Sequence, residues 1–442
     1  MNRAQSILVV SCYELGRQPV AAAGALAALE SAGFQPEIQD VAVEKLSNEA
    51  LRRAQLIFIS APMHTALQLG VRVAARAREV NPAAKIAFFG LYAVLNEQHL
   101  LARHCDFVAG ESPEALVAIA GGDAAASSGL PRARNGTVPS RAALPLLDRY
   151  AKLVVCGGEM RVAGATAASH GCKHLCKHCP IVPVYQGKFV AVPIDAVLAD
   201  VQQQVAAGAQ HITFTDPDFL NGPTHALRIA REVSARWPAL TFDATIKIEH
   251  LLQERALLPE LVRCGLLFIT SAVESLNDEV LRRLAKDHTA ADVPLALQAV
   301  RDAGAELRPT FLPYTPWTEL ADLPALFDFA EEHELEEAID PVQFTLRLLL
   351  PPGSLLIDRA APWLREFDEA AFTWRWQHAD ARVDQLYLAS SELARAEAGS
   401  DPLRTFSQLR DLADRAAQRP ARTPRAPRPE RSVARLTEPW FC

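Results

Sequence analysis

Apolar and polar positions divide the chain into two successive stretches in which short apolar segments alternate with helical patterns. In the first stretch the apolar segments are almost uninterrupted, as in strands that are buried on both faces of a parallel sheet. They lie at residues 6–12, 35–41, 56–62 and 85–90. The pattern predicts a Rossmann-like, doubly wound α/β domain over residues 1–125.

Ligands of a doubly wound sheet bind beyond the carboxyl ends of its strands. Cys12, Tyr13 and Glu14 follow the first predicted strand, and Met63 and His64 follow the third. We expect these residues to line any pocket of the first domain. The chain contains no GxGxxG sequence and no P-loop sequence, so a dinucleotide or P-loop phosphate site is not expected.

The second stretch contains six strand-like segments, each followed by helical sequence or a loop. They lie at residues 161–168, 211–216, 240–247, 267–275, 306–313 and 341–349. Six such units predict a partial (βα)6 TIM-type barrel over residues 152–352. The active site of such a barrel lies in the loops at the carboxyl ends of its strands.

The remaining segments differ from these two domains in composition. Residues 126–151 are predicted to be a linker, because Gly, Ser and Pro are frequent around them. Residues 353–417 have a helical pattern with a dense aromatic group, which we interpret as core. Residues 418–442 form an Arg- and Pro-rich tail, typical of disordered sequence, that ends in EPWFC.

Composition argues against several classes of protein. The formal net charge of -7 gives no reason to expect a nucleic-acid partner. No apolar run is long enough for a membrane span, and the first one is too short for a signal peptide. The 8 cysteines are too sparse for a disulfide scaffold, and a cluster of three indicates a metal site in a reducing compartment. We therefore expect a cytoplasmic enzyme without a membrane segment.

The segment SHGCKHLCKHCP places Cys172, Cys176 and Cys179 at CX3CX2C spacing, directly after the first predicted barrel strand. Short spacings in one loop allow three thiolates to converge on an iron–sulfur cluster. Three protein ligands leave one iron of a [4Fe–4S] cluster open. Structural zinc is the alternative, although such sites usually draw ligand pairs from two separated segments. The histidines that would complete a zinc site are His170, His174 and His178.

This motif resembles the signature of the radical S-adenosylmethionine (SAM) superfamily, with His178 where the family usually has an aromatic residue. The resemblance implies that the open iron binds the amino and carboxylate groups of SAM. It also implies that an electron donor such as flavodoxin or ferredoxin reduces the cluster. SAM is then cleaved to methionine and a 5′-deoxyadenosyl radical, which attacks a small-molecule or peptide substrate.

The resemblance also suggests residues that contact SAM. The segment TDPDF (215–219) corresponds to the family's segment at the SAM amino group, which makes Asp216 and Asp218 candidates. A carboxylate accepts hydrogen bonds from an ammonium group, so this role is chemically sound. For each aspartate, a helix N-cap or turn role is the alternative.

Three later segments carry further candidates by the same resemblance. Glu274 and Ser275, in AVES, correspond to the segment that binds the ribose hydroxyls. Pro313, in PYTPW, would border the adenine, and Arg347 on the sixth predicted strand is a candidate partner for a carboxylate.

A Rossmann-like domain before the barrel is similar to the cobalamin-binding class of the superfamily. The segments GLYAVLN and DFVAGESPE resemble its late strand and exit segments. The DxHxxG motif that supplies an axial histidine to cobalt is absent, and His64 lies in PMHTALQLG instead. The domain is expected either to bind cobalamin without a protein ligand or to serve the substrate or assembly.

The tail resembles that of a narrower group, the radical SAM proteins and selenoproteins with a CUAEP or CCAEP ending. Here Arg435, Leu436 and Thr437 stand before EPWF, so the Cys–Sec or Cys–Cys pair of that group is missing. Cys442, the last residue, is a candidate tethered thiol for the active site. An exposed thiol without a role is the alternative.

The sequence therefore predicts a radical SAM enzyme with a [4Fe–4S] cluster. A cobalamin-dependent radical SAM methyltransferase is the first alternative. The second alternative is a non-catalytic iron–sulfur or zinc-binding sensor, in which the metal orders a regulatory loop.

Overall fold

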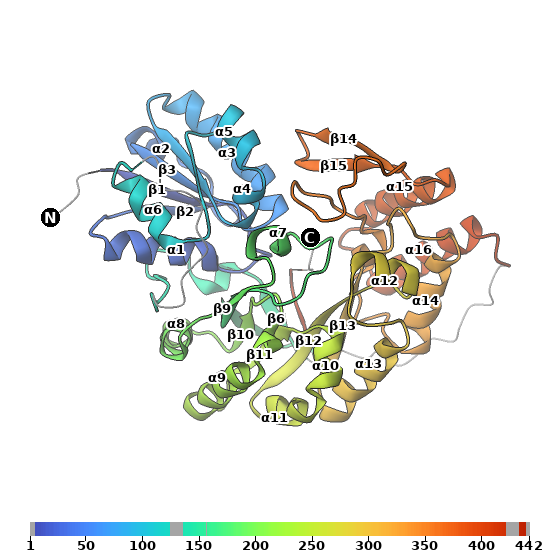
Figure 1. Cartoon of the computed structure of the whole chain (residues 1–442). Coiled ribbons are helices and arrows are strands. Elements are labelled where there is room, and N and C mark those ends of the chain that lie inside the picture. Colours follow the sequence, from blue (N-terminus) through green and yellow to red (C-terminus); the bar gives the residue numbers. More distant parts are fainter. Residues whose placement is uncertain (1–4, 124–135, 156, 421–432, 439–442) are drawn as a thin grey trace.

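The computed structural model describes residues 5–123, 136–155, 157–420 and 433–438. Figure 1 shows two sheet domains next to each other, the first in blue and the larger one in green to orange. The C-terminal region, in orange and red, lies against the larger domain, and its hairpin points toward the first domain (Figure 1).

The first domain contains a wholly parallel sheet with the strand order β2-β1-β3-β4-β5. Every residue of β1 and β3 is buried, because α1 and α6 pack on one face of the sheet and α3 on the other. This arrangement confirms the predicted Rossmann-like domain. The strands are β1 (Ile7–Ser11), β2 (Glu37–Asp40), β3 (Leu56–Ser60), β4 (Lys85–Phe89) and β5 (Phe107–Ala109). The helices are α1 (Val20–Ser31), α2 (Asn48–Arg53), α3 (His64–Val80), α4 (Leu91–Leu95), α5 (Glu97–Arg103) and α6 (Pro113–Ala120).

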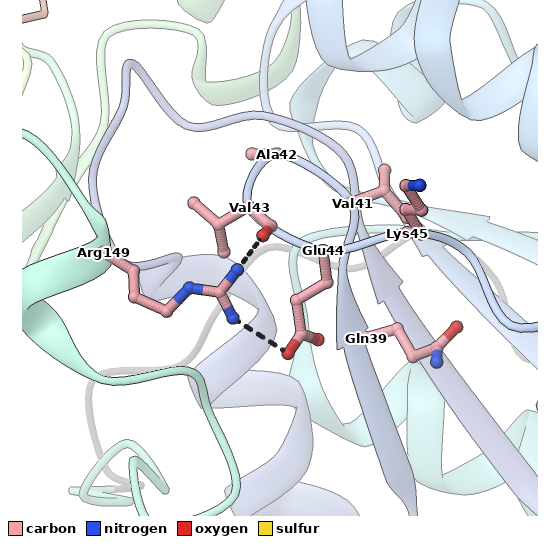
Figure 2. Close-up of a pocket in the computed structure, with 7 residues that line it drawn as sticks. All are labelled: Gln39, Val41, Ala42, Val43, Glu44, Lys45 and Arg149. Atoms are coloured by element: carbon pink, nitrogen blue, oxygen red, sulfur yellow. Dashed lines mark hydrogen bonds and ion pairs between the residues drawn. The ribbon is translucent and has the colours of Figure 1, made fainter.

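The segment between the two domains is anchored to both of them. The buried Arg141 guanidinium donates two hydrogen bonds to Asp200 of the larger domain, at 2.9 and 2.8 Å. It donates a third to Gln18 of the first domain, at 3.0 Å. Arg149 extends toward the loop after β2, where it lies 3.5 Å from a carboxylate oxygen of Glu44 (Figure 2). The described part of the predicted linker therefore joins the two domains by ion pairs.

The larger domain is built on a curled sheet with the order β13-β12-β11-β10-β7-β6-β16. The strands from β7 to β13 run parallel, whereas β6 and β16 are antiparallel. Helices cover its outer face, which confirms the predicted partial barrel. The strands are β6 (Lys152–Val154), β7 (Met160–Thr166), β10 (His211–Phe214), β11 (Thr241–Thr245), β12 (Leu266–Glu274), β13 (Glu306–Phe311) and β16 (Arg435–Leu436). The main helices are α8 (Ile194–Ala206), α9 (Pro223–Arg236), α10 (Ile248–Gln253), α11 (Leu258–Arg263), α12 (Asp278–Leu284), α13 (Asp292–Ala303) and α14 (Asp322–Glu332).

The sixth predicted strand differs from the other five. Its first residues form the 3-10 helix η4 (Pro341–Thr345), and the segment reaches the sheet only through a parallel bridge between Tyr314 and Arg347. The cause is local, because the Asp340 side chain accepts a hydrogen bond from the Val342 N–H at 3.0 Å and caps the turn. Pro341 at the first helical position favours the same turn.

The region that we expected to be helical also contains an antiparallel hairpin, formed by β14 (Leu364–Asp368) and β15 (Thr373–Trp376). Its aromatic residues explain the difference, because aromatic side chains favour strands and pair across them. Phe367 and Trp374, for example, lie with ring centroids 5.7 Å apart. The predicted helices follow as α15 (Ala381–Ala396) and α16 (Pro402–Ala416).

The described part of the tail returns to the two domains. Strand β16 pairs with β6, with Arg435 opposite Val154, and Glu438 accepts a hydrogen bond from the Tyr13 hydroxyl at 2.8 Å. Cys442, the predicted tethered thiol, lies outside the described residues. Among the described residues, no helix has the length and apolar character needed to cross a membrane.

Candidate functional site

The three clustered cysteines lie in the loop between a short ribbon and a helical turn, at the carboxyl end of β7. The ribbon consists of β8 (Ser169–Gly171) and β9 (Phe189–Ala191), and the turn is α7 (Ile181–Tyr185). The loop is held from outside as well, because the Lys177 N–H donates to the Leu284 carbonyl at 2.8 Å.

Gly171, directly before Cys172, has a conformation that only glycine tolerates. Its φ is +75°, and a Cβ there would lie 2.3 Å from Tyr185 and 2.4 Å from the Lys188 carbonyl. The Cys172 thiol points to Asn221, whose side-chain oxygen lies 3.7 Å from the sulfur and accepts the Lys173 N–H at 3.2 Å. The backbone thus fixes the position of the first cysteine.

The three thiols are free and lie close to one another. Burial, together with the neighbouring sulfurs of Cys176 and Cys172, raises the pKa of Cys179 to about 12. Burial also raises the pKa of Cys172. Because the thiolate form binds metal, such buried, mutually repelling sulfurs need a strong positive partner to ionise.

The spacing of possible ligand atoms is larger than a zinc site requires. Tetrahedral zinc with bonds of about 2.3 Å to sulfur holds its sulfur ligands about 3.8 Å apart. In the described part of the chain, no group of three ligand atoms within 4.8 Å of one another includes a cysteine sulfur. His174 and His178 face carboxylates instead. The described residues therefore do not gather the three cysteines and a histidine into a Cys3His zinc site.

A buried charge network lies against the cysteine loop. Glu274, the last residue of β12, has a φ of +67° and its carboxylate lies 3.0 Å from His178 and 3.4 Å from Lys286. Burial raises the pKa of Glu274, but Lys286 and His178 outweigh it and hold the pKa at about 2. Burial likewise disfavours the Lys286 charge, but Glu274 and the Cys176 thiol raise its pKa. A positive charge is thus kept beside the cysteines.

Asp216 and Asp218 follow β10 and are both buried. Asp216 accepts hydrogen bonds from the Ala168 N–H at 2.8 Å and the Ser169 hydroxyl at 2.6 Å, and burial raises its pKa to about 7. Asp218 caps the short helix η2 (Phe219–Asn221) through the Leu220 N–H. The N-cap role considered in the sequence analysis is therefore present for Asp218, whereas Asp216 binds the segment that leads into the cysteine loop.

A second polar group lies on the other side of the loop. His250 of α10 lies 2.6 Å from Asp218, and its ring packs edge-on against His174, with centroids 4.8 Å apart. His174 in turn lies 3.4 Å from Glu249 and 3.2 Å from Asp287. The loop that carries the cysteines is therefore lined by ionisable groups from α10, η2 and the segment after α12.

The other predicted site residues lie near the same end of the barrel or beside it. The Ser275 hydroxyl, one residue after Glu274, accepts the Asn277 N–H at 3.1 Å. Pro313 follows β13, and its carbonyl accepts a hydrogen bond from Thr318 at 2.9 Å. Arg347 does meet a carboxylate, but an internal one, that of Asp384 on α15 at 2.7 Å.

Comparison with known families identifies this constellation. Residues 167–327, which contain the cysteine loop and the strands from β10 to β13, match the radical SAM superfamily. The chain contains a radical SAM domain. The matched family is one of enzymes, and it implies a [4Fe–4S] cluster and SAM as the cofactors of this domain.

Curated relatives match part of the chain at low identity. Ribosomal protein uS12 methylthiotransferase RimO of Cereibacter sphaeroides is 28% identical over 180 residues, which is 38% of each protein. The tRNA-2-methylthio-N(6)-dimethylallyladenosine synthase of Histophilus somni is 26% identical over 239 residues, 49% of this chain and 46% of that protein. The chain thus covers less than half the length of these relatives.

Solved structures share the fold over almost the whole chain. The apo form of the cobalamin-dependent SAM radical enzyme OxsB covers 94% of this chain and 71% of its own, with a TM-score of 0.69 and 12% identity. The radical SAM methyltransferase TsrM of Kitasatospora setae, with tryptophan and a SAM analogue, covers 94% and 95%, with a TM-score of 0.64 and 14% identity. The likeness includes the domain before the radical SAM domain.

In the first domain, the residues expected to line a pocket contact other parts of the chain. Tyr13 binds Glu438, and the His64 Nε2 lies 2.6 Å from the Ala371 carbonyl in the hairpin β14–β15. Glu14 accepts the Val20 N–H of α1 at 2.8 Å. Because the imidazole of His64 is engaged and half-buried, it is not placed as a cobalt ligand. Tyr13, Glu14 and His64 are thus already engaged within the chain.

Sequence reasoning missed several residues of the candidate site. Lys286 lies in no motif, and its role follows only from its contact with Glu274. Asn221 and His250 likewise come from segments that follow separate strands. Because these residues carry no spacing signal relative to the cysteines, only their position after parallel strands could have suggested them.

Proposed function

We propose that this protein is a radical SAM enzyme in which Cys172, Cys176 and Cys179 hold the [4Fe–4S] cluster. The observation that carries the proposal is the loop of three free thiols, one buried and two half-buried, at the carboxyl end of the first barrel strand, inside the matched radical SAM domain. When bound, the cluster supplies an electron that cleaves SAM. Enclosure by the barrel then keeps water away from the reacting groups.

The residues around the thiols serve this chemistry by position and charge. Lys286 offsets the negative charge of the thiolates, as groups behind metal ligands commonly do. Asp216 fixes the strand that leads into the cysteine loop through Ala168 and Ser169. Glu274 and Ser275, at the end of β12, are our candidates for contact with the ribose of SAM, and Pro313 for contact with its adenine.

A cobalamin-dependent methyltransferase is a second candidate, favoured by the likeness to OxsB and TsrM over 94% of the chain. In this function the first domain holds the corrinoid without a protein ligand to cobalt. The missing DxHxxG motif and the engaged His64 agree with that mode of binding. Absorption spectroscopy of protein produced with hydroxocobalamin separates the two candidates, since a retained corrinoid supports the second and its loss on gel filtration contradicts it.

We also propose that the protein lies near the radical SAM group with a CUAEP or CCAEP tail. Support comes from the described tail, where β16 joins the barrel sheet and Glu438 reaches the first domain. Cys442 is then the only tail thiol that could act on the substrate. Unchanged turnover of the Cys442→Ser variant would show that this thiol has no catalytic part.

Anaerobic reconstitution tests the main proposal. The wild-type protein is expected to take up about four irons and four sulfides, and to form 5′-deoxyadenosine from SAM with dithionite or reduced flavodoxin. The variants Cys172→Ala, Cys176→Ala and Cys179→Ala are expected to lose the cluster and to reduce 5′-deoxyadenosine formation by at least about a hundredfold.

The matched control is Cys264→Ala, because Cys264 is a buried cysteine on the outer side of the barrel. It should keep wild-type iron content and SAM cleavage. Bound zinc in place of iron, or a cluster that survives loss of any of the three cysteines, would contradict the proposal.

A further inference from the structure

The half-barrel contains a cavity that the cysteine loop does not line. Its volume is about 750 Å³, within the usual range of about 300–1,000 Å³ for small-molecule sites. Phe268 and Thr270 of β12 and Arg308 of β13 line one wall. The tail strand β16 lines another, together with helix α15.

The cavity and the candidate radical SAM site share strand β12. Alternate residues of a strand share a face, so Phe268 and Thr270 point to the same side of β12, into the cavity, before a bulge between Ala272 and Glu274 interrupts the alternation. Four residues separate Thr270 from Glu274, which corresponds to about 13 Å along a strand. A ligand in the cavity therefore lies along β12 from the candidate SAM site, within the reach of one extended substrate.

Arg308 is a cation without a carboxylate partner in the wall of this cavity. Its guanidinium donates one hydrogen bond, to the Ala434 carbonyl at 3.2 Å, and lies 5.8 Å from the centre of the Phe268 ring. The described residues offer it no ion pair within 4.0 Å. Burial lowers the pKa of Arg308 to about 10, which still leaves it charged at neutral pH. Most of its donors are free for a ligand.

The carboxylates of the cavity wall are already engaged. Asp340 caps η4 through the Val342 N–H, Glu397 pairs with Arg404 at 3.7 Å, and Glu438 accepts the Tyr13 hydroxyl. The other arginines on the wall are Arg17, Arg347, Arg395 and Arg435, and Arg347 already pairs with Asp384. Like Arg308, Arg395 and Arg435 form no ion pair with a described residue. The free charge of the cavity is therefore positive.

We propose that this cavity binds an anionic group of the substrate, a phosphate or a carboxylate, and that Arg308 is its main ligand. The proposal rests on the radical SAM function and adds the chemical class of the substrate. The planar guanidinium suits two-pronged binding of either anion, and the Phe268 ring lies beside it at 5.8 Å. Strand β16 closes the cavity, so the tail has a binding role apart from Cys442.

Isothermal titration calorimetry of the full-length protein at low ionic strength tests this site. Inorganic pyrophosphate represents the phosphate arm and citrate the carboxylate arm. We expect saturable binding of at least one probe, and the tighter probe identifies the anion. Arg308→Gln should weaken that binding about tenfold or more, because charge-assisted hydrogen bonds are lost. Arg308→Lys keeps the positive charge but lacks the paired donors of the guanidinium. Its affinity for the probe should lie between those of the wild type and Arg308→Gln.

Arg236→Gln is the matched control, since Arg236 is exposed at the end of α9, outside the cavity, and its loss changes the net charge equally. It should leave the affinity within about twofold of the wild type. If circular dichroism shows that Arg308→Gln does not fold, the affinity of Arg308→Lys for the probe is the deciding measurement. Binding that is absent in the wild type, or unchanged in the decisive Arg308 variant, overturns the proposal.

The test remains separate from the radical SAM function. Iron content and 5′-deoxyadenosine formation are measured on the same preparations. A protein that cleaves SAM but binds neither probe retains its function and lacks the anion site. A protein that binds a probe through Arg308 but never holds a cluster retains the anion site and contradicts the function.

Discussion

The two parallel sheets of this protein use their carboxyl ends in opposite ways. In the barrel, this edge carries the cysteine loop and a set of buried charges, of which Glu274 and Lys286 are the clearest pair. In the first domain, the loops at the same edge bind other parts of the chain. Tyr13 binds Glu438 of the tail, and His64 lies against Ala371 of the hairpin.

This difference shows that a parallel sheet determines where a site can form, but not whether the loops there bind a ligand or another part of the chain. Both edges are formed by the carboxyl ends of parallel strands, where the ligands of such sheets usually bind. The two edges differ in the partners of their polar groups. At the barrel edge the partners are thiols or charged side chains. At the edge of the first domain they are a backbone carbonyl or a residue of the tail. The following changes test this contrast, from the largest expected effect to the smallest.

Gly171→Ala should do most damage, because it deforms the cysteine loop. The new Cβ would meet Tyr185 and the Lys188 carbonyl at a positive φ. We expect a loss of at least about 3 kcal/mol in the free energy of unfolding and little bound iron, measured by urea denaturation and iron analysis. Gly399→Ala, with φ +86° but open space around it, should lose only about 1 kcal/mol and keep the iron. Equal losses of stability and iron in the two variants would contradict the idea that the cysteine loop requires glycine at position 171.

Lys286→Met tests whether the charges beside the cysteines depend on one another. Glu274 would be left buried with only His178, so its pKa should rise from about 2 and unfolding should become easier by about 3 kcal/mol. Thermal and urea unfolding of the apo protein measure the change. Arg282→Met removes a cation that pairs with Glu279 on the surface of α12 and should cost about 0.5 kcal/mol. Similar losses of unfolding free energy in the two variants would show that the buried Lys286–Glu274 pair contributes no more to stability than a surface ion pair.

Glu14→Gln tests whether the edge of the first domain is closed to water. Burial raises the pKa of Glu14 from 4.5 to about 7, so the folded state binds its proton more tightly than the unfolded state does. The stabilising effect of that proton is complete below pH 4.5 and is lost as the pH rises to about 7. Above pH 7 the variant should be more stable than the wild type by about 2 kcal/mol.

Unfolding free energies of both proteins between about pH 5 and 9 give this difference directly. A difference that does not change with pH would mean that Glu14 titrates as in water and that the edge is open.

Tyr13→Phe should have the smallest effect, because it removes one hydrogen bond between the first domain and the tail. We expect a loss of about 1 kcal/mol in the free energy of unfolding. A double-mutant cycle with Glu438→Ala isolates the contact and should give a coupling of about 0.5–1 kcal/mol. Additive changes in unfolding free energy would show that the Tyr13–Glu438 contact does not stabilise the tail against the first domain.

Sequence patterns predicted the parts of the structure that depend on neighbouring residues. The strands from β7 to β13 lie close to the apolar segments that predicted them, because periodicity is a local property. The sixth strand is the exception, since Asp340 and Pro341 begin a 3-10 turn that the apolar run hides. The hairpin β14–β15 was missed because its aromatic residues also suit a helical core.

The sequence by itself determined the cysteine loop, since three thiols within one short segment must lie together whatever the rest of the chain does. Only the tertiary structure decided the partners of the other site residues. Ser169 and Asp216 are 47 residues apart, and Glu274 meets His178 across 96 residues. His64 meets the Ala371 carbonyl across 307 residues. Such pairs form when packing brings strands and loops together, and no local periodicity records them.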